Sequence, residues 1–412
     1  MHSTKKLIII GGGAAGFFAA ITAAESNPDL SITILEQGLE VLGKVKISGG
    51  GRCNVTHACF DVKELVKFYP RGHKELLSPF YRFNCEHTVD WFENRGVELK
   101  TEEDGRMFPV SNRSQSIIDC LTEQTKLLNI QIIKQAKVMR FETGENFSVY
   151  YNDKKITADY LLIASGSNNT IWQLLKQSGH EIIKPVPSLF TFNIKEELIK
   201  GLEGISLNNV RLSINPETSS GQANKIITEG PVLITHTGLS GPAILKLSAF
   251  AARILHDKKY QFELDINWID MSTDEAIQKL KTEKEAQAKK QANNFSPFDI
   301  PNRFWLSVLN VNGISPQKLV ADFSKQDIQN IAQTLTKSRL KVFSKNTNKD
   351  EFVTAGGVSL KEVDFKTMES KKIRNLYFAG EVLDIDAVTG GFNFQAAWTS
   401  GFIAGSDIGS KG

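Results

Sequence analysis

Residues 48–59, which read SGGGRCNVTHAC, contain residue types that serve three kinds of chemistry. A glycine-rich backbone with an arginine binds phosphate groups, and two cysteines can form a redox dithiol. Cys53, His57 and Cys59 are also zinc ligand types. These are only three ligands within seven residues, and no partner pair elsewhere has the spacing of a structural zinc site, so we expect no metal site.

A second segment with chemical meaning lies near the N-terminus. Gly11, Gly13 and Gly16 form the pattern G-x-G-x-x-G between a strand predicted over residues 6–10 and a helix predicted over about 14–26. In a dinucleotide site the first glycine makes a tight turn and the second lets the backbone approach a pyrophosphate. The third lets the helix pack closely on the strand, while the helix N-terminus offers free N–H groups to the anion.

Glu36 ends a second predicted strand, residues 31–36, twenty residues after Gly16. An acidic side chain at this position accepts hydrogen bonds from ribose hydroxyls and favours an unphosphorylated adenosine ribose. The strand, the helix and the acid together predict dinucleotide binding. They leave the choice between FAD and NAD open.

The elements that must position these residues follow from length and composition. A chain of 412 residues predicts two or three domains. The 49 basic and 46 acidic residues give a net charge of +3, so we expect neither a nucleic acid nor a membrane partner. Four cysteines without a Cys-x-x-Cys pair predict a reducing, cytoplasmic location. Residues 1–25 imitate a signal peptide, but three successive glycines interrupt their apolar run.

The character of the chain changes twice after the first half. Residues 187–270 consist of short alternating segments that predict an antiparallel barrel or sandwich. Residues 272–338 are typical of polar and amphipathic helices, and apolar strand patterns return after residue 351. We therefore predict an α/β fold in which a Rossmann-like domain with a parallel sheet (1–187 and 346–412) is interrupted by a β-barrel domain (188–271) and a small helical domain (272–345).

Three segments, residues 43–57, 235–248 and 367–405, resemble a family of three-domain FAD-dependent oxidoreductases. The family includes aminoacetone-oxidase-like and BaiN-like flavoproteins, and its Rossmann domain is similar to that of glutathione reductase. The resemblance implies FAD as the cofactor. It implies that Glu36 contacts the adenosine ribose and that backbone of Val138 contacts adenine. The further residues expected at FAD are Ala14, Ala15, Gln37, Lys44, Ser48, Gly49, Gly50, Arg52, Cys53, Asn54, Ala164, Ser165, Gly166, Gly380, Glu381, Gly390, Gly391, Phe392 and Asn393.

The last predicted helix begins at the sequence TGGFN, residues 389–393. Its free N–H groups and partial positive charge would face whatever lies before it. Reduced flavin carries negative charge at N1 and the C2 carbonyl, so this helix end would stabilise it. A plain glycine turn is the alternative interpretation of Gly390 and Gly391.

The two cysteines in residues 48–59 leave a dithiol function open. Glutathione-reductase-like flavoproteins have four residues between their redox cysteines, whereas Cys53 and Cys59 have five. In a helix this difference turns one sulfur about 100° away from the other. No second G-x-G-x-x-G is present for a nicotinamide domain. We therefore favour a phosphate and ribityl cradle in which Arg52 supplies charge and Cys53 is a small neighbour of the flavin.

The favoured function is hydride transfer between flavin N5 and a small organic substrate, NADH or NADPH, or both. The sequence leaves open the electron donor or acceptor and whether the enzyme is an oxidase, a dehydrogenase or a reductase. We expect the substrate between the flavin and the inserted barrel, with His236 and Thr237 as catalytic candidates and a packed histidine as the alternative. Two other functions stay open: a disulfide reductase that uses Cys53 and Cys59, and a non-catalytic flavin-binding sensor or partner in RNA modification. The substrate is left open, and we expect a monomer or homodimer.

Overall fold

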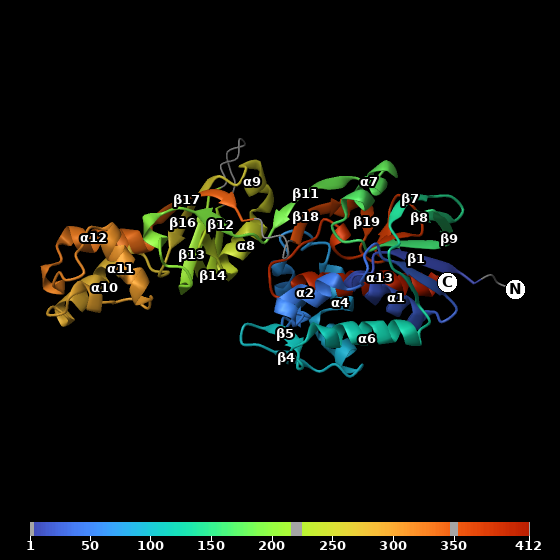
Figure 1. Cartoon of the computed structure of the whole chain (residues 1–412), viewed down its shortest axis with the longest axis horizontal. Helices are drawn as coiled ribbons and strands as arrows, with labels where there is room; N and C mark the ends of the chain where they lie inside the picture. The colour runs from blue at the N-terminus through green and yellow to red at the C-terminus, as the bar shows by residue number, and fades with distance from the viewer. Residues whose placement is uncertain (1–3, 216–224, 347–352, 412) are drawn as a thin grey trace. The chain divides into compact units, whose positions relative to one another are not determined.

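The computed structural model describes residues 4–215, 225–346 and 353–411. The chain forms two compact units (Figure 1). The first unit contains residues up to 186 and from 354 onward, and the second unit contains residues 187–353. Two strands connect the units, β11 (Ile182–Ser188) and β18 (Val353–Val358), and they pair with each other in a two-stranded sheet.

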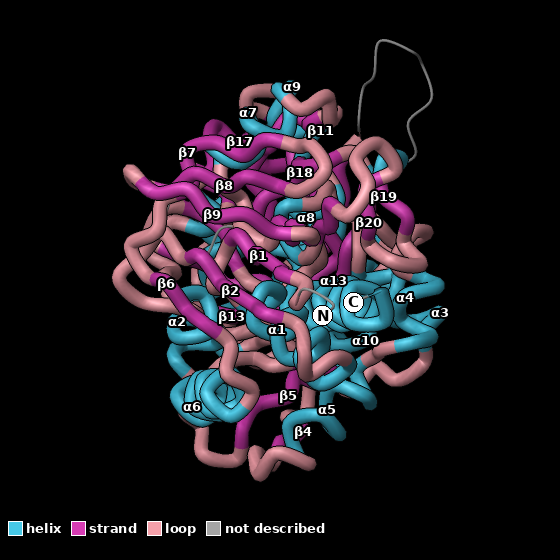
Figure 2. Tube along the Cα trace, turned by 90° about the vertical axis from the view of Figure 1, so that its right-hand side faces the viewer, coloured by secondary structure: helices cyan, strands magenta, loops and turns pink. Residues whose placement is uncertain are grey.

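The first unit is built on a seven-stranded sheet with the order β19-β20-β21-β10-β1-β2-β6. The five consecutive strands from β21 to β6 are parallel, and Figure 2 shows β1, β2 and β6 side by side. Leu7 to Ile10 are all buried, as expected for a parallel strand covered on both faces. The strands are β1 (Lys6–Ile10), β2 (Ser31–Leu35), β6 (Gln131–Ile133), β10 (Tyr160–Ile163), β19 (Val363–Asp364), β20 (Glu369–Ser370) and β21 (Leu376–Phe378).

Helices and two small antiparallel sheets complete the first unit. The helices are α1 (Ala14–Ser26), α2 (Gly43–Gly51), α3 (Val62–Leu65), α4 (Leu77–Arg82), α5 (Cys85–Glu93), α6 (Ser114–Leu127), α7 (Asn169–Gln177) and α13 (Phe392–Lys411). One small sheet contains β3 (Thr56–His57), β5 (Arg106–Pro109) and β4 (Leu99–Thr101). The other contains β7 (Val138–Glu142), β8 (Phe147–Tyr151) and β9 (Lys154–Ala158).

α1 and α13 pack against each other without intervening side chains. Gly401, Gly405 and Gly409 follow each other at every fourth position of α13 and face α1. A Cβ atom at Gly401 would lie 2.7 Å from the carbonyl oxygen of Ala15, and one at Gly405 would lie 2.5 Å from that of Ala19. The order of these contacts shows that the two helices run in the same direction.

The second unit is a closed barrel with helices. The strand order is β12 (Phe192–Ile194), β15 (Gly238–Ser240), β14 (Ile226–Thr235), β13 (Ser206–Ile214), β16 (Phe262–Asn267) and β17 (Ser338–Lys345). The helices are α8 (Pro242–Phe250), α9 (Ala252–Asp257), α10 (Thr273–Ala286), α11 (Asn302–Val311) and α12 (Lys325–Thr336). The predicted fold class, a Rossmann-like parallel sheet with an antiparallel barrel and a helical region, is confirmed.

One strand of the barrel lies where the sequence predicts part of the helical domain. β17 closes the barrel between β12 and β16, although the sequence predicts a helical domain over residues 272–345. Barrel and helices also share one core, in which the Trp268 indole N–H donates to the Ser338 hydroxyl at 3.0 Å. Within the described ranges, no helix combines the length and the apolarity that a bilayer crossing requires.

The packing of α13 on α1 predicts a loss of stability on adding one methyl group. Gly405→Ala should lower the free energy of unfolding by about 1–3 kcal/mol, because the new Cβ overlaps backbone that has no room to move. Gly144→Ala is the control, since its new methyl group lies 3.6 Å from the nearest atom in an exposed loop. Urea unfolding of both variants measures the difference, and equal stability would contradict the close packing.

Candidate functional site

The three glycines of the G-x-G-x-x-G pattern have three different surroundings. Gly11 has a φ of +117°, and a Cβ there would overlap the carbonyl oxygen of Ala164. A Cβ at Gly16 would overlap the carbonyl oxygen of Gly11, so helix and strand touch through backbone. A Cβ at Gly13 would have no atom within 4 Å. Only Gly13 faces open space, as a glycine must where a ligand approaches the backbone.

The start of α1 lies at this open space. The first hydrogen bond of the helix runs from the Phe17 N–H to the carbonyl oxygen of Gly13 at 3.0 Å. The N–H groups of Ala14, Ala15 and Gly16 therefore have no acceptor inside the helix. Gly13 is the N-cap and supplies no capping side chain. These groups and the helix dipole form an anion-binding end.

Glu36 connects the glycine turn to the end of β2. One carboxylate oxygen accepts a hydrogen bond from the Gly12 N–H at 2.8 Å, and the other accepts one from the Gly38 N–H at 2.7 Å. A carboxylate has about four lone-pair positions, so two remain for ribose hydroxyls. Glu36 thus holds the two loops in place before any ligand binds.

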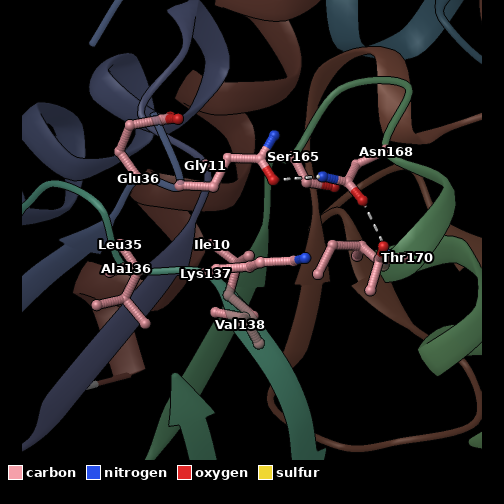
Figure 3. A pocket seen from close by; sticks show the side chains of 12 residues that line it. Ile10, Gly11, Leu35, Glu36, Ala136, Lys137, Val138, Ser165, Asn168 and Thr170 are labelled. Carbon is pink, nitrogen blue, oxygen red and sulfur yellow. Dashed lines mark hydrogen bonds between the residues drawn. The ribbon is translucent and has the colours of Figure 1, made fainter. Parts of the chain in front are cut away.

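A pocket lies at the carboxyl ends of β1, β2 and β10 (Figure 3). Figure 3 shows Val138 on one side and Ser165 and Asn168 on the other, with the Lys137 side chain between them. The Ser165 hydroxyl is buried and has no partner among the described residues. The Asn168 amide donates to the Gln37 side chain at 3.1 Å. The unpaired hydroxyl and the apolar wall fit an adenosine group. The open space before Gly13 fits the phosphates that follow the adenosine.

The glycine-rich segment of residues 48–54 begins in the last turn of α2, where the backbone leaves helical geometry and forms a left-handed turn. Gly49, Gly50 and Gly51 have φ values of 56°, 67° and 83°, respectively. Gly50 and Gly51 have open space at their Cβ positions, whereas Gly49 packs on Phe108. The outer face of this turn is therefore bare backbone, which suits a phosphate or ribityl chain.

Arg52 does not present a free charge to the segment. Its guanidinium forms an ion pair with Glu102 at 2.5 Å and lies 3.9 Å above the ring centre of Phe108. A contact between Arg52 and the cofactor stays a prediction, with a guanidinium that is already paired with Glu102. Nothing in the sequence near Arg52 indicates this partner, which lies fifty residues away.

Hydrogen bonds from distant segments fix the start of α13. Gly391 has a φ of 91°, and its N–H donates to the Asn54 side chain at 2.9 Å. The Tyr69 hydroxyl donates to the carbonyl oxygen of Phe392 at 2.6 Å. The Asn393 side chain accepts a hydrogen bond from the Ala387 N–H at 3.0 Å and donates one to the Ala387 carbonyl oxygen at 3.1 Å. Asn54 and Asn393 thus hold the helix end in position with their side chains.

Buried Gln395 ties the same helix to β3 and α5. Its carbonyl oxygen accepts hydrogen bonds from Thr56 at 2.6 Å and Thr88 at 2.9 Å, and its amide donates to Thr399 at 3.0 Å. Tyr69 and Gln395 were absent from the sequence-based candidates, as were Lys137 and Asn168. For Asn168 a signal was available, because an asparagine shortly after a strand and before a helical pattern indicates an N-cap.

Other predicted residues meet between the starts of α1 and α2. The Lys44 ammonium forms an ion pair with the Glu381 carboxylate. This carboxylate also accepts a hydrogen bond from the Thr354 N–H at 3.1 Å. Gly380 has a φ of 74° and packs against Ala15, and its N–H donates to the Ser400 hydroxyl at 2.9 Å. A Cβ at Gly166 would lie 3.8 Å from the Glu381 carboxylate.

The thiols differ in burial and in proton affinity. Burial raises the pKa of Cys53 to about 12, and its side chain contacts Ser48. Burial also raises the pKa of Cys59, which is partly exposed. The thiol near Cys59 is that of Cys85, which takes a hydrogen bond from the backbone of residue 59. This arrangement disfavours a Cys53–Cys59 dithiol, because Cys53 resists forming a thiolate.

His236 and Thr237, the catalytic candidates from the sequence, form the turn between β14 and β15 of the second unit. The His236 side chain is 90% exposed, and its Nδ1 lies 4.0 Å from Glu203. The carbonyl oxygen of Thr237 accepts the Ile194 N–H at 2.9 Å. His236 is thus an exposed side chain of the second unit. In the part of the chain that the structure describes, no three His, Cys, Asp or Glu side chains gather as a metal site.

The model of the HI0933-like protein Rossmann domain matches residues 5–407. The ribosomal RNA dihydrouridine synthase of Escherichia coli (strain K12) is 26% identical over 419 residues, covering 97% of each chain. The 3-dehydro-bile acid delta(4,6)-reductase of Clostridium scindens is 25% identical over 407 residues, covering 96% of this chain and 97% of its own.

Among solved structures, the chain is similar to the 3-ketosteroid-delta4-(5alpha)-dehydrogenase from Rhodococcus jostii RHA1. The TM-score is 0.50 with 13% sequence identity, and the match covers 98% of this chain and 97% of that one. At this identity the likeness concerns the fold alone.

The environment of Gly13 predicts that a side chain there removes ligand binding and leaves the fold intact. Gly13→Val should weaken FAD binding at least tenfold, because its branched side chain fills the space before α1. The backbone at Gly13, with φ −94° and ψ −171°, accepts any residue. FAD titration of the apoprotein and its thermal unfolding are the two measurements. Gly13→Ala should give an intermediate affinity, and unchanged binding in both variants would contradict a pyrophosphate at this position.

The thiol environments predict an order of chemical reactivity. At pH 8 a thiol reagent should label Cys59 first, since Cys53 with a pKa of about 12 is thiolate in only about one molecule in ten thousand. Cys59→Ser should remove the fast-reacting thiol from the native protein, and Cys53→Ser should not. Fast labelling of Cys53 would instead support the dithiol function.

Proposed function

The chain belongs to the HI0933-like Rossmann-domain family of FAD-dependent oxidoreductases, and on this premise we propose that it reduces a carbon–carbon double bond conjugated with a carbonyl group. Bound FAD would supply hydride transfer, while the protein supplies orientation and electrostatics. The observation that carries the proposal is the open space before Gly13 at the start of α1, next to a pocket lined by Glu36. This combination suits a pyrophosphate and an adenosine ribose.

The first unit offers one group of residues for each part of FAD. The remaining lone pairs of the Glu36 carboxylate would accept hydrogen bonds from the ribose hydroxyls. The Ser165 hydroxyl would form a hydrogen bond with the adenosine. The N–H groups of Ala14 and Ala15 would bind the pyrophosphate. The bare backbone of residues 50–51 would lie along the ribityl chain.

The start of α13 suits the negative end of a flavin ring. Its 20 residues give a helix dipole whose positive end lies at Phe392, directly after two glycines. Asn54, Tyr69 and Asn393 keep this end in one position. A fixed positive end lowers the energy of negative charge that develops there during reduction, without rearrangement of the protein.

The substrate class is inferred from two relatives with different natural substrates. Conversion of uridine to dihydrouridine saturates the C5–C6 bond, which is conjugated with a carbonyl group. The name of the other relative, a 3-dehydro-bile acid delta(4,6)-reductase, likewise places double bonds in conjugation with a 3-keto group. Both reductions add hydride to the far carbon and a proton to the near one. The chain is about equally similar to both relatives. We therefore infer for this protein only the chemistry that the two relatives share.

A small-molecule substrate and a nicotinamide donor complete the proposal. The net charge of +3 gives no reason to favour RNA, so we place a small conjugated ketone first. NADH or NADPH would bind transiently, because the sequence holds one G-x-G-x-x-G pattern and FAD occupies it. The high pKa of Cys53 speaks against the disulfide-reductase alternative.

Flavin release and anaerobic reoxidation test the proposal. Heated protein should release FAD, and NADH or NADPH should bleach the bound flavin. Addition of a 3-keto-4-ene steroid or cyclohexenone should restore the oxidised spectrum at least tenfold faster than buffer alone. A uridine-containing ribosomal RNA fragment is the comparison arm, and faster reoxidation by it would replace the small molecule with RNA. Gly13→Val protein without flavin controls for direct reaction between donor and ketone.

Two results would contradict the proposal at different levels. Release of FMN, or no flavin after reconstitution, would remove the FAD site itself. Bound FAD that no conjugated ketone or uridine reoxidises would leave a flavoprotein with another acceptor.

A further inference from the structure

His57 belongs to strand β3, and its side chain lies at the start of α13. Its ring stacks on that of Phe392, the first residue of α13, with ring centres 4.6 Å apart and planes 21° apart. A Cβ at Gly390 would lie 3.4 Å from Cδ2 of the ring. The imidazole therefore sits beside the positive end of α13, where the proposed function puts the negative edge of the flavin.

The hydrogen bond at one ring nitrogen fixes the state of the other. Nε2 lies 3.1 Å from the carbonyl oxygen of Asp104, which can only accept a hydrogen bond. Nε2 must therefore carry the proton in the neutral ring, and Nδ1 is a bare acceptor. Nδ1 is buried and has no partner among the described residues. A buried acceptor without a donor is a group that a proton would satisfy.

The neutral form of His57 prevails in the protein alone. Burial lowers the pKa of the ring, and Arg106 lowers it further, while Asp104 acts in the opposite direction. Arg106 and Asp104 pair with each other at 2.7 Å, which reduces the net field of both. The thiols of Cys59 and Cys85 and the phenol of Tyr69 have pKa values raised by burial and stay uncharged around neutral pH.

We propose that Nδ1 of His57 takes up one proton when a flavin bound at the start of α13 is reduced, and releases it on reoxidation. This inference rests on the proposed function. A reduced nicotinamide delivers a hydride, which is two electrons and one proton, and leaves one additional negative charge on the ring. The second proton comes from solvent and resides on Nδ1, so the charge of the site is unchanged over the cycle.

The physical reason is the attraction between two opposite charges in a partly buried site. Negative charge near the imidazole raises its pKa, because it favours the imidazolium form. By linkage, protonated His57 favours the reduced flavin equally, which raises the reduction potential at low pH. The effect appears between the pKa of His57 with oxidised flavin and its raised pKa with reduced flavin. In the protein alone, burial holds the pKa of His57 below its ordinary value.

The test is the pH dependence of the flavin midpoint potential in the FAD-loaded protein, measured with dithionite and reference dyes. One additional proton in a two-electron couple steepens the fall of potential by 29.6 mV per pH unit. Wild-type protein should show this steeper segment, and His57→Gln and His57→Asn should not. His180→Asn is the matched control, because burial likewise lowers the pKa of His180, but its Nε2 forms a hydrogen bond with the Ser370 hydroxyl at 2.8 Å.

The outcomes separate this inference from the proposed function. Equal slopes in wild type and both His57 variants, with FAD bound, would overturn the role of His57 alone. Absence of bound FAD in the wild type would overturn the proposed function instead. Should the His57 variants lose FAD, ¹⁵N NMR of the wild-type histidines decides. The His57 signals should change from an Nε2–H neutral ring to imidazolium on reduction at constant pH, and an unchanged ring would overturn the proposal.

Discussion

The close approach of backbone to backbone around α1 is the constraint on which the first unit depends. Gly16 brings the helix against the turn at Gly11, and Gly401, Gly405 and Gly409 bring α13 against its other side. Because no side chain separates these elements, the start of α1 has a single position relative to the sheet and to α13. A larger residue at any of these glycines would displace a helix whose end forms the proposed anion site.

The remaining parts of the site are held by polar groups that do not need a ligand. Glu36 joins the loops after β1 and β2, and Asn54, Tyr69 and Gln395 join α13 to distant segments. Each of these bonds lies in or next to a region of low solvent access, where an unmade bond is costly. A site assembled in this way loses little conformational freedom on binding, which favours tight retention of a large cofactor.

Local patterns predicted the parts of this arrangement that depend on neighbouring residues. The glycine turn, the helix after it and Glu36 follow from spacing along a single βαβ unit. The partner of Arg52 and the roles of Asn54 and Asn393 do not, because each depends on a contact that the fold alone creates. β17 was missed although its burial alternates along the strand, since the segment follows a helix directly and periodicity does not mark where a helix ends.

The pairing of the first and last parts of the chain has a consequence for synthesis on the ribosome. β21 and α13 complete the sheet and cover α1, yet they emerge after the whole second unit. The second unit has its own core and can fold as soon as β17 appears. The first unit must wait with the apolar surface of α1 uncovered until residues 376–411 leave the exit tunnel. A nascent chain of this protein should therefore expose the apolar surface of α1 until α13 is made, and a chain that ends between β17 and α13 lacks the strand and the helix that complete the first unit.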